Sequence, residues 1–251
     1  MKSVYSVFST MAAAALIAIS VPVHAATMDN RIELSAKQSY VFKTYLQSDD
    51  IKIQSKDGAV TLTGTVLEES HKSLAKETVA DLPGVKSVDN KLEVKGTSPT
   101  ANSDAWLLTK VKTTLTFHRS VSSNTTEVGV KDGIVTLKGT ATDQAQKDLT
   151  TEYVKDVEGV KDVKNELVVA KTTKNKQTVG EKIDDASITA QVKMTLLYHR
   201  STSALNTKVT TNDGVVTLVG TAHNAAELNL ATKLASDVNG VKNVKNQMTI
   251  E

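Results

Sequence analysis

The segment Asp57-Gly58-Ala59-Val60-Thr61-Leu62-Thr63-Gly64-Thr65 recurs twice further along the chain, as DGIVTLKGT at 132–140 and as DGVVTLVGT at 213–221. In each copy an Asp-Gly pair separates two runs rich in Val and Ile, and glycine tolerates the positive φ that a two-residue hairpin turn demands. After the turn, apolar Val and Leu alternate with more polar residues, which is typical of a sheet buried on one face only. Each copy therefore predicts a β-hairpin with one face open to water.

A second motif follows each hairpin at a constant distance. It reads GVKSVDN at 84–90, GVKDVKN at 159–165 and GVKNVKN at 240–246, and 26 residues always separate the Asp-Gly glycine from the glycine that opens this motif. Between the two motifs apolar residues recur at helical spacing, as at Leu74, Val79 and Leu82. We expect a helix there, a left-handed glycine after its end and then a third strand. The predicted turn and cap glycines are Gly58, Gly64, Gly84, Gly133, Gly139, Gly159, Gly214, Gly220 and Gly240.

An additional helix is predicted upstream of each hairpin. Asp104 and Asp185 each lie just ahead of a run with helical periodicity, so both are expected to be N-caps. In the first copy, matching Leu46 with Leu115 places Ser35 at the cap and shortens the connection to the hairpin by six residues. The fold class is therefore α+β, with three tandem αββαβ modules, each a three-stranded mixed sheet backed by two helices.

The module boundaries follow from these motifs. We expect module 1 at 32–95 with a divergent first helix, module 2 at 103–170, a linker at 171–182 that holds four lysines and no aromatic residue, and module 3 at 183–251. A unit of this size buries only about 60% of the surface that its unfolded chain exposes. Contacts between modules are therefore expected to matter for stability.

The first 25 residues have the pattern of a secretory signal peptide. Lys2 precedes an apolar run at 11–19, and Pro22 precedes the small residues Val23 and Ala25, so cleavage is expected after Ala25 and a periplasmic location follows. Such a short apolar run cannot cross a hydrocarbon core of about 30 Å.

Composition excludes several classes of protein. Lys+Arg 30 against Asp+Glu 28 leaves a net charge of +2, without the basic footprint that nucleic-acid binding requires. The chain has no cysteine, which excludes disulfides, thiolate zinc sites and a catalytic thiol.

The repeated Asp-Gly hairpin, Val-x-Leu-x-Gly and Gly-Val-x-x-Val-x-Asn motifs resemble the BON domain of bacterial envelope proteins over nearly all of the chain after residue 31. This resemblance implies the αββαβ fold, no catalysis, attachment to phospholipid or to envelope proteins, and roles in osmotic and envelope stress, with chaperone-like activity as a further role. Binding of a small ion such as potassium is a more distant implication of the same family.

The first helix of module 2 offers a candidate lipid-binding face. Aligning the modules as above puts Lys37 and Ser187 opposite Trp106, which indicates an exposed position. With Lys110 and Phe117 on the same helix, Trp106 would suit a layer of anionic headgroups. The alternative is a half-buried tryptophan that covers a junction between modules.

Two clusters, Phe117-His118-Arg119 and Tyr198-His199-Arg200, follow the first helices of modules 2 and 3. A histidine beside an arginine could hold a phosphate. The alternative is that the ring is buried while His and Arg face water or cap a helix carboxyl end. The candidate lipid- or partner-binding residues are Trp106, Lys110, Phe117, Arg119 and Arg200.

The sequence predicts no catalytic, cofactor or metal site. The histidines lie on different elements without metal-ligand spacing, and the patterns of phosphate loops and nucleophile elbows are absent. The expected function is therefore that of a non-catalytic periplasmic stress protein whose tandem modules bind a phospholipid membrane or envelope proteins. The alternative is a holdase for secreted or outer-membrane proteins, and its mark would be an exposed apolar groove between modules. The sequence does not predict an oligomeric state.

Overall fold

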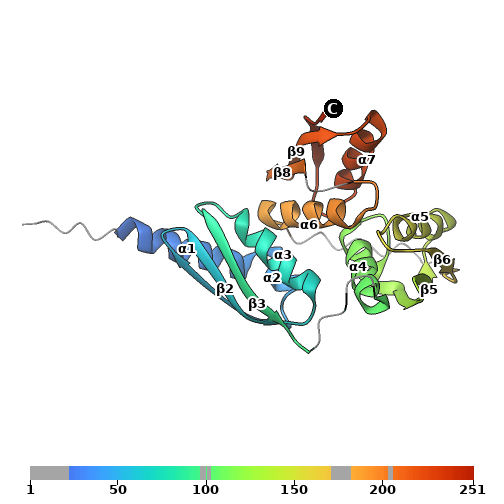
Figure 1. Ribbon diagram of the computed structural model, residues 1–251, viewed down its shortest axis with the longest axis horizontal. Coiled ribbons are helices and arrows are strands. Elements are labelled where there is room, and N and C mark those ends of the chain that lie inside the picture. Colours follow the sequence, from blue (N-terminus) through green and yellow to red (C-terminus); the bar gives the residue numbers. More distant parts are fainter. Residues whose placement is uncertain (1–22, 97–99, 101–102, 171–181, 203–205) are drawn as a thin grey trace, which may run out of the picture.

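The computed structural model describes residues 23–96, 100, 103–170, 182–202 and 206–251, with the side chains of 23–26 left out (Figure 1). The predicted signal peptide lies outside the described residues except for 23–25, and the linker 171–182 except for Lys182. Within the described residues no helix has both the length and the hydropathy needed to span a membrane.

The chain forms three αββαβ modules, as predicted. Module 1 contains α1 (Val23–Gln38), α2 (Tyr40–Thr44), β1 (Asp50–Lys56), β2 (Ala59–Val66), α3 (Glu69–Ala80) and β3 (Ser87–Val94). Module 2 contains α4 (Asp104–Phe117), a short 3-10 helix (Ser123–Thr125), β4 (Thr126–Lys131), β5 (Ile134–Ala141), α5 (Gln144–Lys155), β6 (Asp162–Asn165) and β7 (Val168–Val169). Module 3 contains α6 (Asp185–Tyr198), β8 (Thr207–Asn212), β9 (Val215–Ala222), α7 (Ala225–Ser236), β10 (Asn243–Asn246) and β11 (Thr249–Ile250).

Each sheet is mixed, with the second strand in the centre. In module 1, β2 pairs antiparallel with β1 and parallel with β3. In modules 2 and 3 the third strand is interrupted after an asparagine, and both of its pieces pair with the central strand. The hairpin turns are of the primed kind, because Asp57 and Gly58 have φ values of 52° and 81°, and the other two Asp-Gly pairs are similar. The prediction of turn or cap glycines was wrong for Gly64, Gly139 and Gly220, which lie inside the central strands β2, β5 and β9 with φ values of 112°, 116° and 150°.

The recurring asparagine ties the third strand to the second helix. The side-chain amide of Asn90 donates to Lys72 O at 2.9 Å, and its oxygen accepts from Leu92 N at 3.2 Å. Asn165 and Asn246 make the equivalent bonds in the other modules. The asparagine side chain therefore uses both its NH2 group and its oxygen, and so holds the third strand against the second helix.

The start of each first helix differs from the expectation. Ser103 and Asp184 are the N-caps, whereas Asp104 and Asp185 are the first helical residues. The carboxylate of Asp104 accepts from the N–H groups of Asp132 and Gly133, at 2.7 and 2.9 Å. Asp185 accepts equivalent bonds from its own hairpin. The two aspartates therefore clamp the hairpin turn instead of capping the helix.

The alignment proposed for the first helix of module 1 was also wrong. Asp29 makes the clamp there and lies 28 residues before the hairpin aspartate, the spacing found in the other two modules. The three first helices therefore align without a gap, Ser35 is no cap, and Arg31 rather than Lys37 corresponds to Trp106. The first helix of module 1 is interrupted at Ser39, between α1 and α2. The Ser39 side chain caps α2 and also donates to Ala36 O at 2.8 Å.

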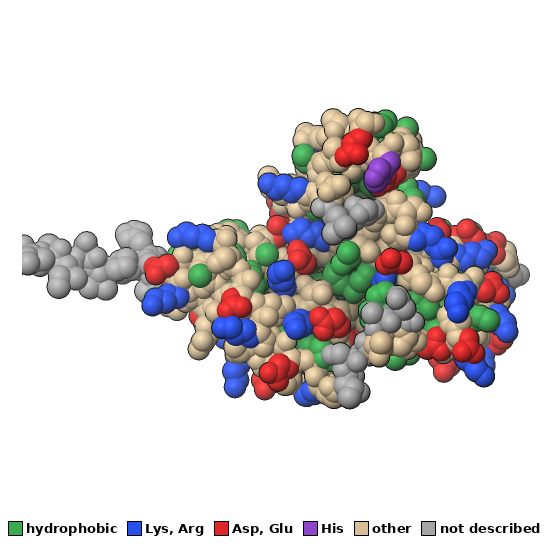
Figure 2. Space-filling model, viewed as in Figure 1, with side chains coloured by type: hydrophobic (Ala, Val, Ile, Leu, Met, Phe, Trp, Pro, Cys, Tyr) green, Lys and Arg blue, Asp and Glu red, His purple; other side chains and the backbone are tan. Residues whose placement is uncertain are grey.

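The buried apolar side chains form two clusters instead of three. One cluster spans modules 2 and 3 together. The other belongs to module 1 but includes Phe117 from module 2 and Ala186, Ala190 and Met194 from α6. In Figure 2 hydrophobic side chains gather near the centre of the view, where the modules meet, while lysines and carboxylates are interspersed elsewhere on this face.

Candidate functional site

Modules 2 and 3 meet through two arginines that cap each other's second helix. The Arg119 guanidinium of module 2 donates to the carbonyl oxygens of Val238 and Val241, both at 2.8 Å, and also to Ser236 O. In the opposite direction, Arg200 of module 3 donates to Val160 O at 3.0 Å and to the carbonyls of Lys155 and Val157. Both arginines therefore bind the negative end of a helix in the other module.

Backbone bonds repeat the same reciprocity. Arg119 N donates to Asp237 O at 3.0 Å, and Arg200 N donates to Asp156 O at 2.9 Å. The bonds from Asn239 N to Phe117 O and from Glu158 N to Tyr198 O, both 3.0 Å, are also equivalent to each other. The junction thus has an approximate two-fold symmetry built from the two aromatic-His-Arg clusters.

The two histidines lie inside this junction. His118 is 2% exposed, stacks on the Tyr153 ring at 3.9 Å between centroids, and its Nδ1 is 3.3 Å from Asp237 Oδ2. The Tyr153 hydroxyl donates to Asp237 Oδ2 at 2.7 Å, and Ser120 donates to the other oxygen. Burial opposes the charge on Asp237, but the hydrogen bonds from Ser120 and Tyr153 and the nearby His118 imidazole hold its pKa below the usual range.

The predicted lipid face on α4 is not an exposed face. Lys110 is 4% exposed and Phe117 is 2% exposed, and Trp106 is half-buried. The Lys110 ammonium lies 4.0 Å from the Trp106 ring centroid, 5.2 Å from the Tyr198 ring centroid and 3.0 Å from Glu158 Oε2. Lys110 and Phe117 therefore pack at contacts between modules, Lys110 beside Tyr198 of module 3 and Phe117 beside Tyr45 of module 1.

Module 3 contacts module 1 through a second stripe of α6. Ala186, Ala190 and Met194 pack against α3, while other residues of α6 face the core of module 3. The N-terminal end of α6 is hydrogen-bonded to the start of α2. Tyr40 N donates to Asp184 Oδ2 at 2.7 Å, and Val41 N donates to Ser187 Oγ at 3.0 Å. We did not predict this contact, although small apolar residues four apart on a second face of α6 were a visible signal.

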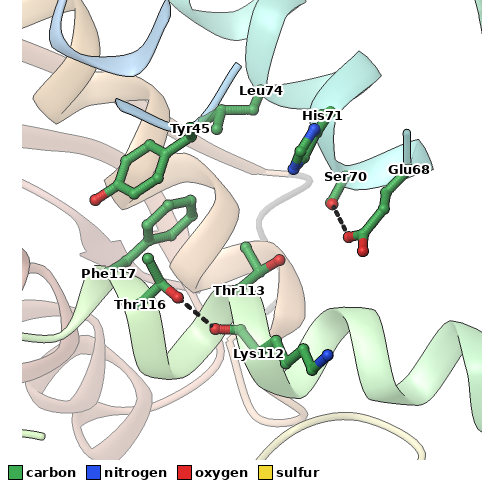
Figure 3. A pocket seen from close by; sticks show the side chains of 9 residues that line it. All are labelled: Tyr45, Glu68, Ser70, His71, Leu74, Lys112, Thr113, Thr116 and Phe117. Carbon is green, nitrogen blue, oxygen red and sulfur yellow. Dashed lines mark hydrogen bonds between the residues drawn. The ribbon is translucent and has the colours of Figure 1, made fainter. Parts of the chain in front are cut away.

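A cleft lies between modules 1 and 2. Figure 3 shows Tyr45 and Phe117 facing each other from the two modules, with ring centroids 5.4 Å apart, and the Lys112 side chain running alongside α4. The cleft has a volume of about 190 Å³, and a neighbouring hollow of about 370 Å³ shares Tyr45, Lys112 and Thr116 with it. Its lining combines two aromatic rings and Leu74 with hydroxyl and charged groups, which suits an occupant with both apolar and polar parts.

Two ionisable groups at the cleft are already engaged. His71 Nδ1 lies 2.7 Å from Asp49 Oδ2. Burial raises the pKa of the Tyr45 hydroxyl, so this ring stays neutral. Among the described residues no three His, Asp or Glu side chains are grouped as metal ligands.

The outward sheet face of module 3 differs in charge from the other two. The outward positions of β8, β9 and β10 carry Lys208, Lys245 and the exposed Val219, and no carboxylate. The corresponding face of module 1 carries Asp89 among its lysines, and that of module 2 carries Glu127.

Sequence and structure comparisons place the chain among known proteins. The BON domain matches residues 28–96, 103–171 and 184–251. The osmotically-inducible protein Y of Escherichia coli strain K12 is 35% identical over 147 residues, which cover 58% of this chain and 71% of that protein. The outer membrane lipoprotein DolP of Haemophilus influenzae is 34% identical over 113 residues, which cover 45% of this chain and 56% of the lipoprotein.

A solved structure, the C-terminal domain of CdsD from the type III secretion system of Chlamydia trachomatis, aligns over 89% of this chain and 97% of its own at 16% identity. Its TM-score is 0.24, which is too low to indicate a shared overall fold. The three matched modules, which include the hairpins and asparagine ties described above, decide the family: the chain belongs to the BON domain family.

Proposed function

We propose that this is a non-catalytic protein of the bacterial envelope, located in the periplasm after removal of residues 1–25, that protects envelope proteins during osmotic or envelope stress. The names of its relatives, an osmotically-inducible protein and an outer membrane lipoprotein, support the cellular setting. The cleft between modules 1 and 2 supports the activity, which is binding of unfolded polypeptide segments.

The lining of the cleft favours polypeptide as its occupant. Tyr45 offers partly exposed aromatic surface, backed by the buried ring of Phe117, and aromatic side chains dominate binding energy at protein interfaces. Lys112 and Glu68 offer charges of both signs, and threonines of α4 offer hydroxyls. An extended segment of an unfolded protein carries these same three kinds of group, and no covalent chemistry is required of the site.

The experiment is suppression of aggregation of an outer-membrane β-barrel protein diluted from urea, followed by light scattering. Thr113→Trp fills the cleft from α4, and it should at least halve the protection given by the unmodified protein. Thr109→Trp is the matched control, because Thr109 lies one turn earlier on α4 and does not line the cleft. Absence of protection by the unmodified protein would contradict the proposed binding of unfolded polypeptides. Equal protection by the two variants would show that the binding site is not the cleft.

Binding to a phospholipid surface is a second candidate, favoured by the outward face of module 3. Lys208 and Lys245 flank Val219 there without an acidic neighbour in β8, β9 or β10, and the Glu251 carboxylate after β11 is bonded to Thr221. Each lysine near an anionic surface contributes about 1 kcal/mol. Lys208→Gln with Lys245→Gln should therefore weaken sedimentation with phosphatidylglycerol vesicles roughly 30-fold. The same change at Lys52 and Lys91 of module 1 is the control, and equal losses would contradict a role specific to module 3.

A further inference from the structure

His199 occupies a closed position in the junction between modules 2 and 3. Its side chain is 7% exposed. It borders a small cavity of about 10 Å³, whose other lining residues include His118, Tyr153, Asp156, Thr195 and Tyr198. That volume holds one water molecule at most. An imidazolium formed at His199 would therefore have almost no solvent around it.

Both ring nitrogens of His199 lie near polar groups of the closed junction. The backbone N–H of Ser201 donates to Nδ1 at 3.1 Å, and Nε2 lies 3.6 Å from Asp156 Oδ2. Since Nδ1 accepts a hydrogen bond, the neutral ring carries its proton on Nε2, on the side of Asp156. A second proton would have to be added at Nδ1, where it would face the Ser201 N–H and break that bond.

We propose that the junction between modules 2 and 3 opens at mildly acidic pH, because the closed junction has no place for a second proton on His199. Module 3 would then be held by its contact with module 1 and by the chain that joins it to module 2 after residue 170. The junction is thus a pH-sensitive contact inside a three-module chain.

The charges around His199 favour this outcome. Arg200, the next residue along the chain, and His118, which follows α4, disfavour a further positive charge, whereas Asp156 at the end of α5 attracts it. The Asp156 side chain is 47% exposed, so water screens its attraction. The other ionisable groups nearby are Tyr198, Tyr153 and Asp237, and the last already accepts bonds from Ser120 and Tyr153.

The direction of the effect follows from proton linkage. Burial first, then Arg200 and His118, lower the pKa of His199 in the closed junction despite the pull of Asp156. The open junction exposes the ring, whose ordinary pKa is about 6.5. The open state therefore binds more protons as pH falls below about 6.5, and the closed state loses stability in that range. At neutral pH the contribution of His199 to the closed state is complete.

The absence of cysteine allows a sensitive test on the full chain. Thr195 is 3% exposed, and its hydroxyl has no hydrogen-bond partner among the described residues, so Thr195→Cys introduces a buried thiol into the junction at little cost. Its labelling rate by a methanethiosulfonate reagent, divided by the rate of the same variant in urea at each pH, measures how often the junction opens. The protection should fall at least threefold between pH 7.5 and pH 5.

Three controls make the result specific. His199→Gln in the same background should remove the pH dependence, and His223→Gln should retain it, because His223 lies on the surface away from the junction. A thiol placed by Ala190→Cys in the contact between α3 and α6 should show no comparable change. Thr114→Cys on α4 repeats the measurement from module 2 if the first reporter disturbs folding.

Protection that is constant from pH 7.5 to pH 5 would overturn the proposal. A pH dependence that survives His199→Gln would also overturn it, since the titrating group would then be elsewhere.

Discussion

Module 3 is held by two neighbours in two different ways. Its contact with module 2 is reciprocal and polar, because Arg119 and Arg200 each bind backbone carbonyls across the junction. Its contact with module 1 is not reciprocal and is largely apolar, because α6 places the small side chains of Ala186 and Ala190 against α3. Three copies of one fold therefore do not form three equal contacts, and a few surface residues decide which copies pair.

The residues that differ between equivalent positions explain this pairing. Module 1 has Lys43 and Thr44 where modules 2 and 3 have His and Arg, and Thr44 cannot reach the carbonyls of a neighbouring helix end. On the first helices, Ala190 of α6 corresponds to Thr109 of α4, which stays partly exposed. The His-Arg pairs that bind helix ends join modules 2 and 3 to each other. The alanine stripe, Ala186 and Ala190, joins α6 to module 1.

Removing both arginines should have the largest effect on this arrangement. A hydrogen bond that involves a charged group contributes about 1.5–3 kcal/mol, so Arg119→Ala with Arg200→Ala should weaken the junction by about 4 kcal/mol. Urea unfolding followed by the fluorescence of Trp106, the single tryptophan, reports on module 2, and far-UV circular dichroism reports on the whole chain. The two transitions should separate in the variant.

Arg31→Ala is the control for the arginine variant. Arg31 is exposed on α1, and no hydrogen bond or ion pair joins its side chain to another of the described residues, so its removal should leave the two transitions as they are in the unmodified protein. Coincident transitions in the double arginine variant would show that the capping bonds do not hold the modules together.

Overpacking the apolar contact should have the next largest effect. Ala190 is fully buried between α6 and α3, and Ala190→Leu adds atoms that a packed interface can accept only by moving, at a cost of about 2 kcal/mol. Calorimetry should show a lower transition temperature for module 1, with the pair of modules 2 and 3 unchanged. Thr109→Leu at the equivalent position of α4 should have little effect, and equal losses from both would contradict the role given to the stripe.

The fold could be predicted largely from the sequence, because three copies of the hairpin and cap motifs each have a local mechanical cause. The exceptions were the N-caps of α4 and α6 and the alignment of the first helix of module 1. Its apolar periodicity is interrupted at Ser39, and matching Leu46 with Leu115 hid the constant spacing between Asp29 and the hairpin. A clamp between an aspartate and a turn 28 residues later is a long-range bond that periodicity does not reveal.

The candidate sites could not be predicted to the same degree, because they depend on how the modules pack. Phe117, Lys110 and Arg119 have the composition of a lipid-binding face, and only the tertiary arrangement shows that they lie at junctions. The alternative that arginine caps a helix carboxyl end named the right chemistry, but the helix belongs to another module. The cleft beside Tyr45 is formed by residues from two modules and has no motif in either.

A smaller effect is expected from the ion pair that accompanies the apolar contact. Lys193 Nζ lies 3.0 Å from Glu77 Oε2, and about a quarter to a third of each side chain is exposed. Such a pair contributes roughly 0.5 kcal/mol and is screened by salt. Glu77→Gln should therefore lower the stability of module 1 slightly at low salt and have no measurable effect in 1 M NaCl. A larger loss would mean that the charge pair, and not the alanine stripe, joins these modules.

The smallest effect concerns His223, whose position reverses the sign found for His199. The ring lies on the surface at the start of α7, with Nδ1 2.8 Å from Glu227 Oε2. The hydrogen bond with Glu227 and the charge of that carboxylate raise the pKa of His223, whereas burial lowers that of His199. A raised pKa stabilises the folded chain fully below about 6.5, and this contribution is lost as pH rises through the folded value. An NMR titration should therefore place His223 above its ordinary pKa and His199 below it. Glu227→Gln should return His223 toward the ordinary value and leave His199 unchanged, because the location of each ring decides the direction of its shift; a joint response of both histidines would contradict their separate roles.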